Sequence, residues 1–176
     1  MLKTLVISAV LVTLIAPQLG GQTIRLGPQV GLQKAAAADD AKFMFGAALR
    51  LKLTSALGVE GSINYRQEKF ANDALTVRSW PIMLTGMLYP LPIVYGGVGA
   101  GWYNTTFDFD LPGVDNETKQ EFGWHFGAGV ELPLGKKTRL TGDLRYVFLD
   151  YDFDEVPFQD VDSNFYMISA GILFGL

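Results

Sequence analysis

The chain has 176 residues, which is enough for one domain and too short for two substantial ones. Apolar residues make up 49% and charged residues 18%, which excludes a disordered chain, and the formal net charge of −4 argues against a nucleic-acid partner. Because the chain has no cysteine, structural disulfides, iron–sulfur clusters and thiol nucleophiles are excluded as well.

The N-terminal segment, residues 1–21, has the pattern of a secretory signal peptide. Lys3 supplies the positive start, and the apolar run that follows, residues 5–16, is shorter than the roughly 20 residues of a membrane span. Pro17 and a Gly-Gly pair then interrupt it. We predict cleavage near Gly21, which leaves residues 22–176 as the mature domain. An uncleaved anchor helix is the alternative, and the lack of cysteine excludes a lipoprotein.

From Thr23 onward, apolar and polar residues alternate with period two, which predicts strands and no helix of convincing length. We predict eight strands, over residues 23–33, 42–53, 57–69, 75–89, 93–107, 119–132, 138–152 and 163–176. The connections alternate in length. Those at 54–56, 90–92 and 133–137 are short, whereas those around 34–41, 70–74, 108–118 and 153–162 are generally longer and more polar. This alternation is the plan of an up-and-down outer-membrane barrel.

The two faces of each predicted strand differ in kind. One is apolar, as in Phe122, Trp124 and Phe126, while the other carries polar residues and glycines, as in His125 and Gly127. Small residues beside long charged ones suit the narrow lumen of eight strands. The sequence therefore predicts an all-β fold, an eight-stranded antiparallel up-and-down transmembrane β-barrel. A soluble lipocalin or sandwich stays open, since alternation alone does not say which face is wet.

Outward aromatic residues gather toward the long-loop end of the predicted strands. Such a ring is the interfacial girdle of membrane proteins, in which the ring body is buried and its polar edge is wet. The turn at residues 90–92 is expected to set Trp80 opposite Trp102. The predicted girdle consists of Phe43, Tyr65, Trp80, Trp102, Trp124 and Tyr166.

Three stretches carry a family resemblance: residues 94–103 (VYGGVGAGWY), residues 122–131 (FGWHFGAGVE) and the terminal strand, residues 165–176. They resemble the small outer-membrane barrels of the OmpA-barrel, OmpX and OmpW-like superfamily, over essentially the whole mature chain. Members often end in phenylalanine, whereas this chain ends in Leu176 with Phe174 two places earlier. The resemblance implies structural, adhesive or small-solute roles, and assembly by the barrel-assembly machinery.

Charged residues on the inward face are expected to form a polar network in the lumen. The short turns predict three facing pairs, Arg50 with Glu60, Glu131 with Arg139 and His125 with Arg145. His125, the only histidine, is interpreted as a network member, because a catalytic histidine needs a placed nucleophile and orienting group. The predicted network consists of Arg50, Glu60, Glu121, His125, Glu131, Arg139, Asp143 and Arg145.

Acidic residues also gather beyond the seventh predicted strand, at Asp150, Asp152 and Asp154. The simpler interpretation is that they are solvated acidic residues of a loop. The alternative is a divalent-cation site shared with lipopolysaccharide phosphates. Arg78 lies outward beyond Trp80, where it is expected to reach a lipid phosphate.

The favoured function is a closed structural or surface-interaction barrel, without enzymatic activity, cofactor or bound metal, because the inward set is balanced in charge and bulky at places such as Tyr95 and Tyr103. A narrow channel or transporter is the alternative, and a lipid-modifying enzyme is the least favoured. The expected partners are outer-membrane lipid and lipopolysaccharide, with the assembly machinery during biogenesis and no nucleic acid.

Overall fold

The computed structural model describes residues 23–35, 41–70, 75–109, 117–149 and 164–176. Within these ranges the chain forms strands joined by turns, and no helix is long and apolar enough to cross a membrane. The strands are β1 (Thr23–Ala35), β2 (Lys42–Lys52), β3 (Leu57–Phe70), β4 (Leu75–Ser79), β5 (Ile82–Leu91), β6 (Val94–Phe109), β7 (Glu117–Pro133), β8 (Thr138–Leu149) and β9 (Phe165–Gly175).

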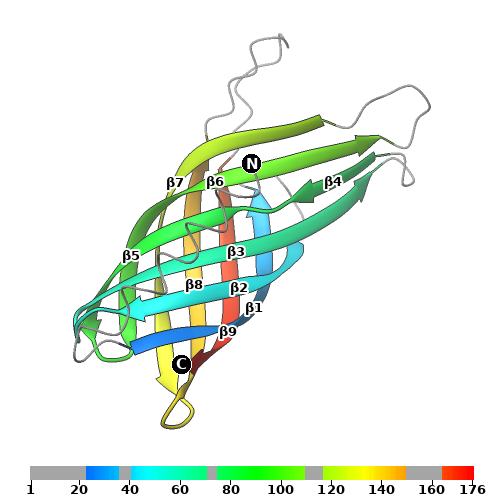
Figure 1. Ribbon diagram of the computed structural model, residues 1–176. Coiled ribbons are helices and arrows are strands. Elements are labelled where there is room, and N and C mark those ends of the chain that lie inside the picture. The colour runs from blue at the N-terminus through cyan, green and yellow to red at the C-terminus, as the bar shows by residue number, and fades with distance from the viewer. Residues whose placement is uncertain (1–22, 36–40, 71–74, 110–116, 150–163) are drawn as a thin grey trace, which may run out of the picture.

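The strands close into one antiparallel barrel, because β1 pairs with both β2 and β9 (Figure 1). β4 and β5 are two halves of one strand, separated at Trp80 and Pro81. Proline has no N–H to donate to the ladder, but the register with β3 and β6 is the same on both sides of the break. The predicted eight-stranded antiparallel barrel is therefore confirmed.

The register also gives the stagger of the barrel. Cα partners on neighbouring strands, followed once around the barrel from Arg25 of β1, return to β1 at Ala35, ten residues further along. For eight strands this stagger requires a tilt of roughly 40° from the barrel axis. The stagger decides which side chains share a height, because directly paired residues on neighbouring strands lie at different heights.

The alternation of the two faces holds throughout the described strands. Outward positions carry exposed apolar residues such as Leu26, Val98 and Ile168, while inward positions are buried or half-buried. Glycines on the inward face leave the space that their neighbours' long side chains occupy: Gly97 lies against Thr85, Gly99 against His125, and Gly127 against Arg145. The lumen is thus filled by side chains, as expected for eight strands.

Glycines on the two faces should respond oppositely to alanine. At inward Gly99 an added Cβ would lie 2.1 Å from the Leu84 carbonyl oxygen and 2.5 Å from His125 Nε2, whereas at outward Gly61 it would meet nothing within 4 Å. We expect Gly99→Ala to destabilise the barrel by about 1–3 kcal/mol through overpacking. Gly61→Ala should be neutral or stabilising, since glycine costs about 0.5–1 kcal/mol in a strand interior. Urea unfolding of the folded barrel measures both, and equal losses would contradict the assignment of faces.

Two of the three short turns lie elsewhere than predicted. Pro92 and Ile93 form a two-residue turn between Leu91 and Val94, with a bulge between Leu88 and Leu91. Proline presets the φ of about −65° that the first central position of a type I or type II turn takes. The register therefore moves by two residues, so that Ile82, and not Trp80, lies opposite Trp102.

The β7–β8 connection shows a similar displacement. Pro133 remains in β7 and pairs with Arg139, and the Leu134 N–H donates to the Thr138 carbonyl at 3.1 Å. Glu131 consequently pairs with Thr141, and His125 with Val147. Glu131 and Arg139 are therefore not directly opposite as expected, although they still form the expected ion pair at 3.7 Å. The expected facing pair His125–Arg145 is wrong, whereas the turn at residues 54–56 gives Arg50 opposite Glu60 as expected.

Half of the barrel projects further at the long-loop end. β4 pairs with β3 out to Phe70 and with β6 out to Phe109, and β6 pairs with β7 back to Glu117. Figure 1 shows β3, β4, β6 and β7 extending past the ends of β1, β2, β8 and β9. The stretch 108–118, expected to be a loop, is therefore partly strand.

Candidate functional site

The densest polar cluster of the described residues lies in the lumen and is centred on Arg50 of β2. Its guanidinium donates from Nε and Nη2 to Glu60 Oε2, at 2.8 and 2.5 Å, and from Nη1 to Glu131 Oε2 at 3.0 Å. Glu60 is on neighbouring β3, but Glu131 is on β7, on the far side of the lumen. The guanidinium also lies over the Tyr95 ring, 4.6 Å from its centroid. One arginine thus joins β2, β3, β6 and β7.

Arg145 of β8 makes the second connection across the lumen. Its Nη2 donates to Glu60 Oε1 at 2.5 Å and to Asp143 Oδ1 at 3.1 Å. The Tyr95 hydroxyl donates to the same Asp143 oxygen. Both Glu60 oxygens are therefore held by arginines from different strands, and all these groups are buried. Buried charges of this kind are tolerated only when paired and hydrogen-bonded.

The cluster continues to the short-turn end of the barrel. Glu131 Oε1 accepts from Arg25 at 3.4 Å and lies 3.7 Å from Arg139 Nε, while its Oε2 also accepts from the Tyr89 hydroxyl at 2.9 Å. Lys52 Nζ lies 3.9 Å from the Tyr89 ring centroid. A carboxylate on β7 thus collects donors from β1, β2, β5 and β8.

His125 lies above this cluster, toward the long-loop end. Its Nε2 is 2.8 Å from Thr85 Oγ1, which also accepts from Arg145 Nη1 at 3.4 Å. Among the described residues, no partner is found for His125 Nδ1, although the side chain is only 3% exposed. The histidine is therefore joined to Arg145 through a threonine hydroxyl, and not directly as the predicted pairing would have it.

A layer of apolar side chains covers the cluster on the long-loop side. These residues are buried and in mutual contact, and they come from β2, β5, β6, β8 and β9. They are Met44, Met83, Tyr103, Val147, Phe165 and Met167. A second, smaller apolar group, Met87, Tyr89 and Tyr95, lies near the short turns. From the long-loop end toward the short turns, the described lumen thus holds the apolar layer, then the ion cluster, and then a mixture of apolar, aromatic and charged side chains.

The structure brings together most of the predicted network but adds members that sequence reasoning missed. Glu121 is half-buried opposite Tyr103, higher in the lumen than the ion cluster. Arg25, Tyr89, Tyr95 and Thr85 were missed, although their inward parity and donor groups were visible in the sequence. The contacts Arg50–Glu131 and Arg145–Glu60 join strands that are not neighbours, and no turn could have indicated them.

On the outer face, the six predicted girdle residues lie at one height. The ten-residue stagger and a strand rise of about 3.3 Å place their Cα atoms within about 4 Å of one another along the axis. Trp102 contacts Phe122, and Phe122 contacts Trp124, at ring-centroid distances of 5.8 and 5.3 Å. Trp80 instead lies beside Asn104, whose side-chain amide donates to the Trp80 carbonyl at 3.3 Å.

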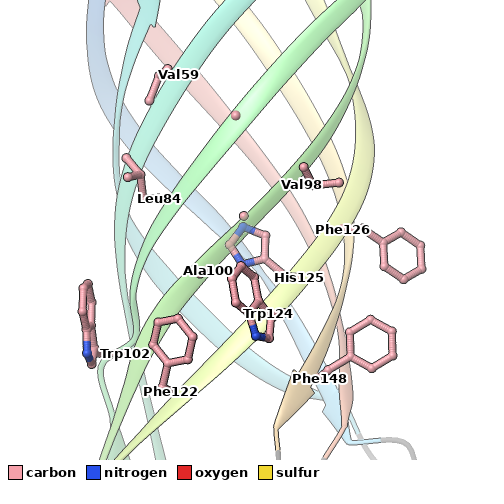
Figure 2. Close-up of a pocket in the computed structure, with 12 residues that line it drawn as sticks. Val59, Leu84, Val98, Ala100, Trp102, Phe122, Trp124, His125, Phe126 and Phe148 are labelled. Atoms are coloured by element: carbon pink, nitrogen blue, oxygen red, sulfur yellow. The ribbon is translucent and has the colours of Figure 1, made fainter.

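A shallow groove runs over the outer face of β5, β6 and β7. Gly86 and Ala100 are among its lining residues, and Trp102, Phe126 and Phe148 stand around it. Figure 2 shows these three rings pointing away from the strands. The groove is apolar, and it lies on the surface that a bilayer would cover.

Arg78 has a protein partner that the sequence did not suggest. Its Nη2 is 2.5 Å from Asp108 Oδ2 on β6, and the arginine side chain is 47% exposed. Asp108 was expected in a loop but belongs to a strand. The acidic residues 150, 152 and 154 and the segment 1–21 lie outside the described residues. Within the described part, no group of three His, Asp or Glu side chains is placed to hold a metal ion.

Comparison with known proteins supports the architecture. The family model of the outer membrane protein beta-barrel domain matches residues 6–174. Among solved structures, the chain is similar to Ail, the attachment invasion locus protein of Yersinia pestis, in complex with the heparin analogue sucrose octasulfate. The identity is 17% and the TM-score 0.59, with 88% of this chain and 97% of that chain covered.

Two further solved structures show the same fold. A major outer membrane protein from Thermus thermophilus has a TM-score of 0.62 at 12% identity, with 89% of this chain and 100% of that chain covered. OprG from Pseudomonas aeruginosa has a TM-score of 0.54 at 19% identity, with 88% and 96% covered. No curated protein sequence matches the chain. By its closed barrel and by a family match over nearly its whole length, the chain belongs to the outer membrane protein β-barrel domain family.

Proposed function

We propose that the protein is a closed outer-membrane barrel with a structural and surface-contacting function. The observation that carries this proposal is the filled lumen, in which an apolar layer lies over an ion cluster that joins opposite walls. A water-filled pore needs a continuous polar path. Here Arg50, Glu60 and Tyr103 are almost fully buried, and Met44 and Val147 lie in the layer above the ions.

The ion cluster is also balanced in charge. Arg25, Arg50 and Arg145 face Glu60, Glu131 and Asp143, so that each buried charge has an opposite partner. A ring of one sign, which would select an ion, is not found among the described lumen residues. The narrow-channel alternative would require this cluster to separate.

Enzymatic activity is not favoured by the histidine site. Thr85 and His125 form a hydroxyl–imidazole pair, but both side chains are buried inside the lumen beside Gly99. A triad-type site needs a third group to orient the imidazole, and space where a reacting atom can sit. The first condition is not met by the described groups, because no third group is bonded to His125 Nδ1. The space that His125 borders is the apolar groove of the outer face.

The proposed location is the outer membrane, after export through a signal peptide in residues 1–21. Membrane lipid and lipopolysaccharide would cover the apolar outer face, and the barrel-assembly machinery would insert the chain. The terminal strand β9 supports this, because Tyr166, Ile168 and Phe174 face outward along its length.

The projecting ends of β3, β4, β6 and β7 are the proposed surface for contacts outside the membrane. Their outer face is polar: Thr106 and Thr118 hydrogen-bond at 2.9 Å, Gln120 donates to Asn104 at 2.6 Å, and Arg78 pairs with Asp108. This face lies beyond the aromatic girdle, where a bilayer no longer covers the strands.

Conductance measurements in planar bilayers test the closed lumen. We expect the unmodified barrel to show no steady conductance. Arg50→Ala should introduce openings because it removes the side chain that ties Glu60 and Glu131 together across the lumen, whereas Lys136→Ala in the exposed β7–β8 turn should not. A large, steady conductance of the unmodified barrel would overturn the proposal and favour the channel.

A further inference from the structure

Four side chains with soft metal-donor atoms lie at one level of the lumen. They are Met44 of β2, Met83 of β5, His125 of β7 and Met167 of β9, and each is at most 3% exposed. With β4 and β5 counted as one strand, they come from every second strand around the barrel. The stagger places their Cα atoms within about 4 Å of one another in height. Side chains at such positions point toward a common centre.

The three methionines are in one contact cluster, and strand pairing places His125 next to it. The three methionines pack in one cluster with Val147, and Val147 is the cross-strand partner of His125. Thr85, which holds His125, is two residues from Met83 on the same face of β5. The histidine is thus placed beside the methionine cluster from β7, a strand on which that cluster has no member.

The methionines of the described strands all lie on the face toward the lumen. The chain has five methionines, and the four that follow Met1, including Met87, are all buried in the lumen. The exposed apolar face is built instead from leucine, isoleucine, valine and aromatic residues. Methionine fills irregular gaps well, but its sulfur is also a soft ligand.

His125 offers one ring nitrogen for which no hydrogen-bond partner is found among the described residues. A ligating imidazole usually donates its second ring N–H to a fixed acceptor, which leaves the other nitrogen bare for the metal. Here Nε2 is held by Thr85 Oγ1 at 2.8 Å, while Nδ1 finds no partner among the described residues. An unpaired nitrogen in a buried side chain is costly, and a bound ion would satisfy it.

We propose that Met44, Met83, His125 and Met167 form a site for one soft monovalent metal ion, copper(I) or silver(I). Thioether sulfur and imidazole nitrogen select copper(I), whereas hard divalent ions require oxygen ligands. The other members of the layer, Tyr103, Val147 and Phe165, supply no carboxylate. The proposal is independent of the closed-barrel function, because an ion can bind in a lumen that does not conduct.

Titration of the folded barrel with silver(I) tests the site, because silver(I) has copper(I)-like ligand preferences and stays in one oxidation state. Chloride-free calorimetry in detergent micelles is expected to show one tightly bound ion per chain, and no binding of zinc(II). Met83→Leu and Met167→Leu conserve volume, and each should weaken silver(I) binding at least tenfold. Met87→Leu, a buried lumen methionine outside the layer, is the matched control and should leave it unchanged.

Silver(I) is also added to the unfolded chain before refolding, so that slow entry of the ion into the folded lumen does not prevent binding from being detected. Heat-modifiable migration on a gel checks that every variant is folded. Absence of stoichiometric binding under both conditions would overturn the proposal. So would a loss in Met87→Leu equal to that in Met83→Leu, since any lumen sulfur would then serve.

Discussion

Replacing Glu60 with alanine is expected to destabilise the barrel by about 3–5 kcal/mol, because it leaves two buried arginines without their shared carboxylate. Arg50 and Arg145 each donate to a different oxygen of Glu60, and all three side chains are buried. Any water that enters the lumen will reduce the loss. Urea unfolding of the barrel in phospholipid vesicles, followed by heat-modifiable gel migration, measures it.

The matched control is Glu121→Ala, which removes a half-buried lumen carboxylate at the long-loop end and should cost much less. Arg50→Ala and the double variant complete a thermodynamic cycle with Glu60→Ala. Because the two residues are in direct contact, their losses should be less than additive. Strict additivity, or equal effects of Glu60→Ala and Glu121→Ala, would contradict the ion cluster.

Replacing Val98 with arginine is expected to cost about 2–4 kcal/mol, the penalty of a charge at the bilayer midplane on the lipid face of a barrel. Val98 is 69% exposed, and on β6 it lies midway between Val94 at the short turn and girdle residue Trp102. No lumen contact is disturbed, so the penalty reports the lipid environment alone.

Leu134→Arg is the control for Val98→Arg. Leu134 is 58% exposed in the β7–β8 turn, where an arginine reaches water and should cost about 0–1 kcal/mol. Folding into vesicles and urea unfolding give the two values. Equal tolerance at both positions would mean that the apolar face does not meet a bilayer.

The barrel architecture could be predicted from the sequence because it depends only on the alternation of apolar and polar residues along each strand. This alternation separates the outward face from the lumen face whatever the exact turns are. Phe126 therefore lies outward and Arg145 inward, although the predicted register between β7 and β8 was wrong. The same holds for the girdle, since a shift of two residues moves an aromatic ring by only about 5 Å along the axis of a tilted strand.

Pairing within the lumen could be predicted only in part. Arg50 opposite Glu60 follows from the turn at residues 54–56. The β5–β6 and β7–β8 turns depend on which proline stays in a strand, and at both turns the pairing moved by two residues. Contacts across the lumen, such as Arg50 with Glu131, depend on the stagger of the whole barrel, which no local pattern contains.

Tryptophan fluorescence quenching by brominated lipids tests the membrane placement most directly. The chain's three tryptophans, Trp80, Trp102 and Trp124, all lie outward in the girdle. In vesicles whose acyl chains are brominated at one depth, quenching should be strongest for bromines near the headgroups and weak for bromines at the chain ends. Strongest quenching at the chain ends, or none at any depth, would contradict a barrel that crosses the bilayer with these residues at the interface.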